Sequence, residues 1–175
     1  LNRIDELVSE GKTDIGANLV PSMIKDSRVY AYPFDGYWRD VGTLESYWDC
    51  SMNLLSPKDS GLDLKRWKMR TNLFSSEICN RAATRFGSKA DIANSFISQG
   101  CVIKGKVRRS ILSPGVVVEE GAEVIDSILF HDTHVHQGAK VVQTITDKHV
   151  SIGSSARLIP EPGDQPNSKF STFIF

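Results

Sequence analysis

A repeat of 17 residues is the feature that most restricts how this chain can fold. The segment "SILSPGVVVEEGAEVID" (110–126) aligns without a gap with "SILFHDTHVHQGAKVVQ" (127–143), and "TITDKHVSIGSSARLIP" (144–160) continues the register. Within each repeat an aliphatic residue or a threonine recurs at steps of six, six and five residues, and a shorter repeat precedes the first full one. The recurring positions are Ile97, Ile103, Val107, Leu112, Val118, Val124, Leu129, Val135, Val141, Thr146, Ile152 and Leu158.

A step of about six residues matches neither the period of a helix nor that of a simple strand. It is typical of a coil with three flat faces, in which each hexapeptide forms one face and directs one side chain inward. Stacked coils would bury these side chains as a continuous aliphatic column. Three residues after an inward side chain the backbone must turn a corner. Such corners often need a positive φ, which glycine adopts readily and aspartate can adopt. The expected corner residues are Gly100, Gly115, Gly121, Asp132, Gly138 and His149.

The repeat therefore predicts a mainly β protein whose residues 91–175 form a left-handed parallel β-helix. The handedness comes only from the similarity of this hexapeptide pattern to the known left-handed fold, because general crossover rules favour the right hand. A β-sandwich built from short strands is the alternative.

Residues 1–56 carry mixed helix and strand signals, and residues 57–90 form a connector. The segment "SRVYAYPF" (27–34) alternates as a strand does. Thr43 is a candidate N-cap for a helix. Spacings of three and four residues give that helix one apolar face. The face consists of Leu44, Tyr47, Trp48, Met52 and Leu55.

Composition argues against several classes of protein. The 21 basic and 21 acidic residues balance, which argues against a general nucleic-acid binder. No apolar run approaches the roughly 20 residues of a membrane span. Cys50, Cys79 and Cys101 are far apart, which favours a reducing cytoplasm over a disulfide framework or a zinc site.

Three motifs resemble those of glucose-1-phosphate adenylyltransferases: "DIGANLVP" (14–21), "YAYPFDGYWRDVGTLESYWDCSMNLL" (30–55) and the hexapeptide coil from "ISQGCVIKG" (97–105) onward. Such enzymes convert ATP and glucose 1-phosphate to ADP-glucose and pyrophosphate for glycogen or starch synthesis. The resemblance implies that residues 1–56 are the C-terminal edge of a Rossmann-like α/β nucleotidyltransferase domain, followed by the β-helix. It also implies an allosteric, cytoplasmic homotetramer.

The resemblance implies site residues as well. Asp40 matches a family aspartate that binds Mg²⁺, which offsets phosphate charge in phosphoryl transfer. Trp38 matches a residue that lines the glucose pocket, and Asp14 one that hydrogen-bonds the sugar. Ile15 stands where the family usually has phenylalanine. Three alternatives stay open: a cap or salt-bridge role for Asp40, a core role for Trp38, and a turn or N-cap role for Asp14.

Several family motifs are not found in these 175 residues. They are the "GGGxGTRL" nucleotide loop, the motif with the first catalytic aspartate, and the Glu-Lys pair that holds the sugar phosphate. The chain is therefore expected to be the C-terminal portion of such an enzyme and to be inactive alone. The alternatives are a non-catalytic regulatory subunit, a sugar-phosphate nucleotidyltransferase of the GDP-mannose type, and a hexapeptide acyltransferase.

Two further clusters have open interpretations. The segment "KGKVRRS" (104–110) places Lys104, Lys106, Arg108 and Arg109 near one coil, either as a solvated edge or as an anion site for sugar-phosphate or phosphate effectors. In "HDTHVH" (131–136), two histidines share a strand face, but no cysteine or acidic ligand evidently converges on them. Solvated histidines are the expected outcome there.

Overall fold

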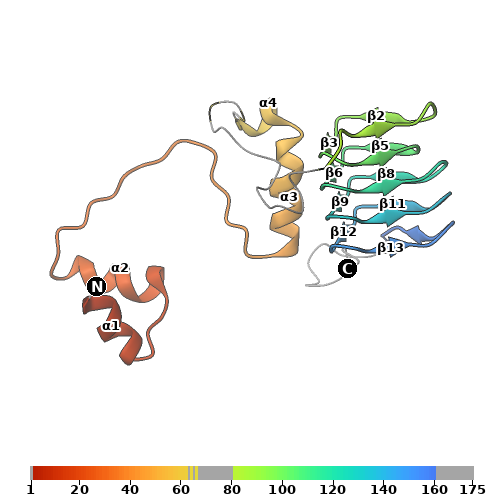
Figure 1. The fold of residues 1–175 in the computed structure, drawn as a ribbon. Coiled ribbons are helices and arrows are strands. Elements are labelled where there is room, and N and C mark those ends of the chain that lie inside the picture. Colours follow the sequence, from red (N-terminus) through yellow and green to blue (C-terminus); the bar gives the residue numbers. More distant parts are fainter. Residues whose placement is uncertain (1, 63, 65, 67–80, 161–175) are drawn as a thin grey trace. The chain divides into compact units, whose positions relative to one another are not determined.

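The computed structural model describes residues 2–62, 64, 66 and 81–160. Within the described residues, the β-helix consists of three parallel sheets, and consecutive strands of the chain belong to different sheets (Figure 1). The predicted parallel β-helix is confirmed, and the β-sandwich alternative is wrong.

The first sheet contains β1 (Arg85–Phe86), β4 (Val102–Ile103), β7 (Val117–Val118), β10 (His134–Val135) and β13 (Ser151–Ile152). The second contains β2 (Asp91–Ala93), β5 (Lys106–Arg108), β8 (Glu123–Ile125), β11 (Lys140–Val142) and β14 (Arg157–Leu158). The third contains β3 (Phe96–Ile97), β6 (Ile111–Leu112), β9 (Ile128–Leu129) and β12 (Ile145–Thr146).

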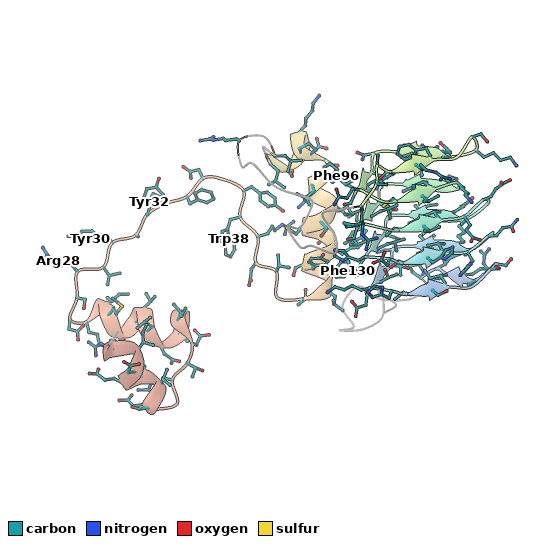
Figure 2. All side chains as sticks on the ribbon, viewed as in Figure 1. Arg28, Tyr30, Tyr32, Trp38, Phe96 and Phe130 are labelled. Carbon is teal, nitrogen blue, oxygen red and sulfur yellow. The ribbon has the colours of Figure 1, made fainter. Side chains whose placement is uncertain are left out.

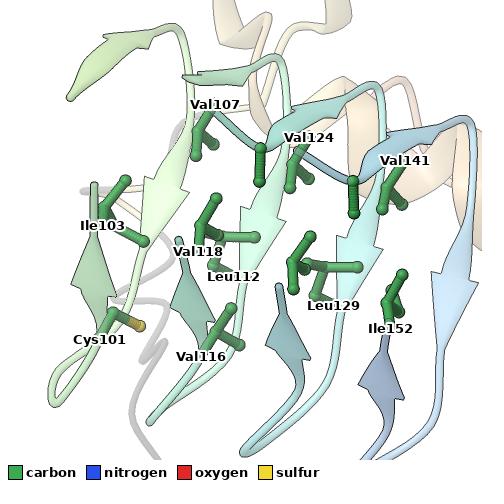
Figure 3. Close-up of a cluster of buried hydrophobic side chains, with 13 residues drawn as sticks. Cys101, Ile103, Val107, Leu112, Val116, Val118, Val124, Leu129, Val141 and Ile152 are labelled. Carbon is green, nitrogen blue, oxygen red and sulfur yellow. The ribbon is translucent and has the colours of Figure 1, made fainter. Parts of the chain in front are cut away.

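The predicted inward positions form the core of the β-helix. Residues 17 apart pair across neighbouring coils, as Val118 does with Val135 and Leu112 with Leu129. These four side chains are fully buried, and Figure 3 shows the stacked aliphatic column to which they belong. The column also includes Cys101, Val116, Ala122 and Ala139, which the six-residue step alone did not predict.

The predicted corners are confirmed as well. Gly100, Gly115, Gly121, Asp132, Gly138 and His149 all have φ between 57° and 79°. A further set of corners with positive φ was missed, and its members are not glycine: Asn94, Arg109, Asp126 and Gln143, with φ between 42° and 50°.

A ladder of hydroxyl groups follows the missed corners. Each backbone N–H of this ladder donates to the hydroxyl one coil earlier: Ser110 to Ser95, Ser127 to Ser110 and Thr144 to Ser127, each at 3.1 Å. The four hydroxyls donate in turn to backbone carbonyls two residues earlier, at 2.7–2.9 Å. Because Ser110, Ser127 and Thr144 are buried, this ladder satisfies polar groups that water cannot reach.

The coil that contains β4 and β5 is shorter at one corner. Only Lys104 and Gly105 separate β4 from β5, whereas residues 119–122 separate β7 from β8. A Cβ atom at Gly105 would lie 2.3 Å from the carbonyl oxygen of Ala122 and 2.5 Å from that of Glu119. The short corner therefore requires glycine.

Helix α3 (Leu44–Leu54) lies along the third sheet (Figure 1). The outer face of that sheet presents an apolar row, Phe96, Ile111, Ile128 and Ile145, and Met52, Leu55, Tyr47 and Trp48 pack against it. Trp48 Nε1 donates to the carbonyl of Asp126 at 2.8 Å, and the ring of Tyr47 meets Phe130 edge-on at 6.4 Å. The predicted apolar helix face is confirmed, and its partner is the β-helix.

The predicted connector, residues 57–90, contains a short helix and the first strand of the β-helix in its described part. The short helix α4 (Pro57–Ser60) follows α3, and Phe86 belongs to β1, the first strand of the β-helix. Arg81 forms a bidentate ion pair with Asp132 at 2.6 and 2.7 Å, which fixes the start of the β-helix against a corner three coils later. Trp67 and Phe74 of the predicted connector lie outside the described residues.

The chain divides into two compact units, Leu1–Gly36 and Tyr37–Phe175. The sequence predicts a domain boundary after residue 56, whereas α3 packs with the β-helix. The first unit contains α1 (Asn2–Ser9), a π-helical turn η1 (Ile15–Leu19) and α2 (Val20–Ile24), which has proline in its first turn. The strand predicted for residues 27–34 does not form. The chain is extended there, but no strand of the described residues pairs with it.

Candidate functional site

The segment that carries Trp38 and Asp40 is anchored at both ends to α3. The Tyr37 hydroxyl accepts a hydrogen bond from Asn53 Nδ2 at 3.0 Å. At the other end, Thr43 caps α3 through reciprocal bonds of 3.1 Å with the backbone N–H and hydroxyl of Ser46. Both ends of this segment are therefore fixed to a helix that is itself packed on the β-helix.

Trp38 and Asp40 are nevertheless solvent-exposed. Trp38 is 74% exposed, and Figure 2 shows its ring projecting from the extended segment. Asp40 is exposed, and no hydrogen bond or ion pair among the described residues involves it. The described residues thus give no support to a salt-bridge or cap role for Asp40, or to a core role for Trp38.

Asp14 and Ile15 lie in the first unit. Asp14 is the N-cap of η1: its Oδ1 accepts from the Ala17 N–H at 2.6 Å, and its own N–H donates to Asn18 Oδ1 at 3.1 Å. Ile15 is 69% exposed. Both residues line a hollow of about 160 Å³ whose remaining walls are mostly the apolar side chains of α1 and η1. The N-cap alternative for Asp14 is confirmed, and this role leaves its carboxylate at the rim of an apolar hollow.

The four basic residues of 104–110 do not form one free patch. Arg108 pairs with Asp91, and Arg109 Nε lies 2.6 Å from Asp126 Oδ1. Lys106 Nζ is 3.8 Å from Glu123, which also lies 3.4 Å from Lys140. Lys106, Glu123 and Lys140 are aligned across three strands of the second sheet as a ladder of alternating charge.

Lys104 is the one member of that cluster without an ion pair among the described residues. With Lys89 and Lys106 it lines a hollow of about 280 Å³, but Glu120 and Glu123 line the same hollow. Glu120 pairs with Lys89, which holds the pKa of the Glu120 carboxyl below its usual value. A phosphate bound here would compete with these two carboxylates.

The histidine pair has an acidic neighbour that the sequence interpretation overlooked. Glu119, His134 and His136 place one ligand atom each within 4.8 Å of one another. Glu119 stands 17 residues before His136, so the repeat itself aligns the two on neighbouring coils. The repeat could have identified this residue from the sequence, because the position 17 residues before His136 is Glu119.

Comparison with known families decides what kind of chain this is. A family model described as "GlmU-like, C-terminal hexapeptide" matches residues 80–170, which is more than half of the chain. The chain belongs to this GlmU-like hexapeptide family. A second model, "Nucleotidyl transferase", matches residues 3–57 and therefore covers the motifs of Asp14, Trp38 and Asp40.

Three curated proteins that are similar to this chain are named glucose-1-phosphate adenylyltransferase. The chain is 36% identical to a glucose-1-phosphate adenylyltransferase of Acetivibrio thermocellus over 88% of this chain and 35% of that protein. It is 44% identical to one of Clostridioides difficile (66% and 29%) and 34% identical to one of Desulfitobacterium hafniense (97% and 42%). The predicted resemblance is confirmed, and the chain spans about a third of the length of these relatives.

The match to nucleotidyl transferases and the β-helix together confirm the predicted fold class, an edge of a nucleotidyltransferase domain followed by a hexapeptide β-helix. The assignments of individual site residues stay predictions. Among the described residues, no helix is both long and apolar enough to cross a membrane.

Proposed function

We propose that the whole protein to which this chain belongs is a glucose-1-phosphate adenylyltransferase, which makes ADP-glucose and pyrophosphate from ATP and glucose 1-phosphate. The observation that carries the proposal is the similarity to a relative of that name over 97% of this chain, across both the nucleotidyltransferase edge and the β-helix. The exposed Trp38 and Asp40 support it, because both have side chains available to a substrate.

In this proposal Asp40 is one ligand of Mg²⁺. A single exposed carboxylate without a competing partner among the described residues fits such a role, because Mg²⁺ takes few carboxylates and keeps several waters. The ion, when bound, would offset negative charge on the triphosphate. The anchors at Tyr37 and Thr43 restrict the chain on either side of Asp40, which would limit where the carboxylate can lie when substrate arrives.

Each of the two other predicted regions has a feature that suits a sugar. Trp38 offers a flat apolar surface for a sugar ring, and Asp14 offers a carboxylate at the rim of an apolar hollow. Ile15 gives that rim an aliphatic wall in place of the aromatic ring expected in the family.

Regulation belongs to the proposal too. Sugar phosphates or phosphate would bind near Lys104 and the neighbouring cations of 104–110, in a homotetramer. Because three of the four cations are already paired, such an effector would act by exchanging carboxylate partners for phosphate. A reducing cytoplasm suits the free thiols of Cys50 and Cys101.

The decisive experiment offers the full-length enzyme ATP, GTP, UTP and TTP, each with glucose 1-phosphate, and measures pyrophosphate release. A clear preference for ATP is the expected result. A preference for GTP with mannose 1-phosphate would assign the protein to the GDP-mannose type. No turnover with any pair, in a folded protein that binds a catalytic partner subunit, would assign it a regulatory role.

A further inference from the structure

One side-chain cluster on the β-helix is not used by the proposed function. His134 lies in β10, and His136 follows that strand, so both point outward on either side of the buried Val135. Their rings stack with centroids 4.0 Å apart and planes 21° apart. Glu119 follows β7 on the preceding coil, where its N–H donates to the carbonyl of Val135 at 2.9 Å. Two neighbouring coils therefore contribute to one surface cluster.

The donor atoms of the cluster converge. Glu119 Oε1 is 2.8 Å from His134 Nε2 and 3.6 Å from His136 Nδ1. A tetrahedral Zn²⁺ with bonds of about 2.05 Å would hold its ligand atoms about 3.3 Å apart, between these two distances. We propose that Glu119, His134 and His136 bind a divalent transition-metal ion of the zinc class on the outer face of the first sheet.

The groups around the three ligands support a metal site. His136 directs its other ring nitrogen, Nε2, to the hydroxyl of Ser151 at 3.1 Å. The second oxygen of Glu119 accepts a hydrogen bond from the Gln137 N–H at 2.9 Å. Such outer hydrogen bonds orient metal ligands and fix the histidine tautomer. Two of the three ligands thus already have the partner that a metal site requires.

A hydrogen-bonded cluster without metal would satisfy these groups less well. Glu119 Oε1 faces both imidazoles, but at 3.6 Å the His136 contact is too long for a good hydrogen bond. A divalent ion would bind all three ligand atoms at once after a rotation of one imidazole, because each ring's lone pair lies in the ring plane and the two planes are only 21° apart.

The donor set also selects the ion. Two imidazole nitrogens and one carboxylate oxygen suit Zn²⁺, Co²⁺, Ni²⁺ or Cu²⁺ and are a poor set for Mg²⁺, which prefers oxygen ligands. Three protein ligands leave a fourth position for water. The pairing of Ile103 with Val118 places Lys104 beside Glu119 on the coil before, so a positive charge flanks the site and opposes the cation.

The test titrates metal-free full chain with Zn²⁺ by calorimetry and with Co²⁺ by absorption spectroscopy. We expect one ion per chain and visible ligand-field bands without the near-ultraviolet charge-transfer band of a cobalt–thiolate bond. His134→Gln, His136→Gln and Glu119→Gln should each weaken Zn²⁺ binding by more than the roughly 10- to 100-fold that loss of an outer-shell partner causes. Lys104→Gln should strengthen it.

The matched control is His149→Asn, which removes a histidine that is 74% exposed at another corner of the β-helix. It should bind Zn²⁺ as tightly as the unchanged chain. Glu119→Gln keeps an acceptor for the Gln137 N–H, so it tests the ligand without removing that backbone contact. Undetectable Zn²⁺ binding by the unchanged chain would overturn the proposal. So would equal binding by the folded double variant His134→Gln/His136→Gln, or a cobalt–thiolate band.

Discussion

Two regions of this chain are rich in large apolar or aromatic side chains, but those side chains differ in how much of their surface solvent can reach. In residues 28–41, Tyr30, Tyr32 and Trp38 are 84%, 88% and 74% exposed, and Figure 2 shows all three projecting from the extended chain. In the β-helix, aliphatic side chains such as Leu129 and Val124 are fully buried. Leu129 and Val124 each pair with residues 17 positions away on neighbouring coils, whereas the aromatic residues of 28–41 have no sheet partner among the described residues. Side chains of the first region are therefore available for binding, and those of the second for stability.

The strongest test of this difference removes a buried side chain. Leu129→Ala should lower the free energy of unfolding of the chain by about 2–5 kcal/mol, because the stacked coils cannot collapse into the cavity. Tyr32→Ala is the exposed counterpart and should change it by less than about 0.5 kcal/mol. Urea unfolding followed by circular dichroism measures both. Equal losses would remove the distinction between the two regions.

The second test concerns activity instead of stability. Asp40→Asn in the full-length enzyme should lower kcat by about 10²-fold or more, since it removes charge at a phosphoryl-transfer site. Its unfolding midpoint should stay unchanged, because Asp40 is exposed and unpaired among the described residues. Asp59→Asn, an exposed aspartate in α4, is the control and should keep full turnover. Near-normal kcat in Asp40→Asn would contradict the assigned role.

The third test addresses a polar part of the β-helix. Ser127→Ala removes the acceptor for the buried Thr144 N–H, which should cost about 1–3 kcal/mol of unfolding free energy. Ser154→Ala, at an exposed position of the last coil, should have almost no effect. If both variants unfold at the same denaturant concentration, the hydroxyl ladder has no stabilising role.

A fourth, smaller effect depends on pH. The Arg81 guanidinium bonded to Asp132 holds the pKa of that carboxyl below its usual 3.8. The ion pair therefore stabilises the chain fully above the unfolded pKa, and this contribution is lost as the pH falls through the lower folded pKa. Asp132→Asn should unfold more easily at pH 7, by about 1 kcal/mol. Its stability should also depend less on pH below 4 than that of the unchanged chain, and identical acid unfolding curves would contradict this account.

The smallest expected effect concerns regulation. The double variant Arg108→Ala/Arg109→Ala should weaken the response of the full-length enzyme to sugar phosphates or phosphate by about fivefold or less, at the lower end of typical coupling. The effect is expected to be small because both arginines already pair with aspartates. The ratio of rates with and without effector measures it. An unchanged ratio, with the oligomer intact by light scattering, would identify the cluster as a solvated edge.

Much of the β-helix could be predicted because one repeat determines it. The step of six residues gave the inward aliphatic residues, and corner geometry gave six positions with positive φ. The corners at Asn94, Arg109, Asp126 and Gln143 were missed because their residue types are less specific than glycine. The outward row of Ile111, Ile128 and Ile145 is equally periodic, but only the packed helix α3 reveals its function.

The candidate site was less accessible to sequence reasoning. Motifs named Asp14, Ile15, Trp38 and Asp40, but whether they meet depends on contacts between distant segments, and the two pairs lie in different compact units. The basic cluster looked uniform in sequence, yet its ion pairs come from strands one coil before and after it. Glu119 is the opposite case, because alignment by the repeat is enough to place it beside His136.

The short corner at Gly105 has a consequence for how such a protein can change during evolution. Ser95 and Ser110 keep their hydrogen bond although they are 15 residues apart, instead of the 17 that separate Ser110 from Ser127. The coil is two residues shorter at this corner, where the absence of a Cβ atom at Gly105 lets the backbone lie close to the carbonyl oxygens of Glu119 and Ala122. A deletion of two residues at another coil's corner would thus need a glycine there to be inherited with it. Duplication of a whole 17-residue coil would need no such companion change, so the length of the β-helix is free to vary in whole coils.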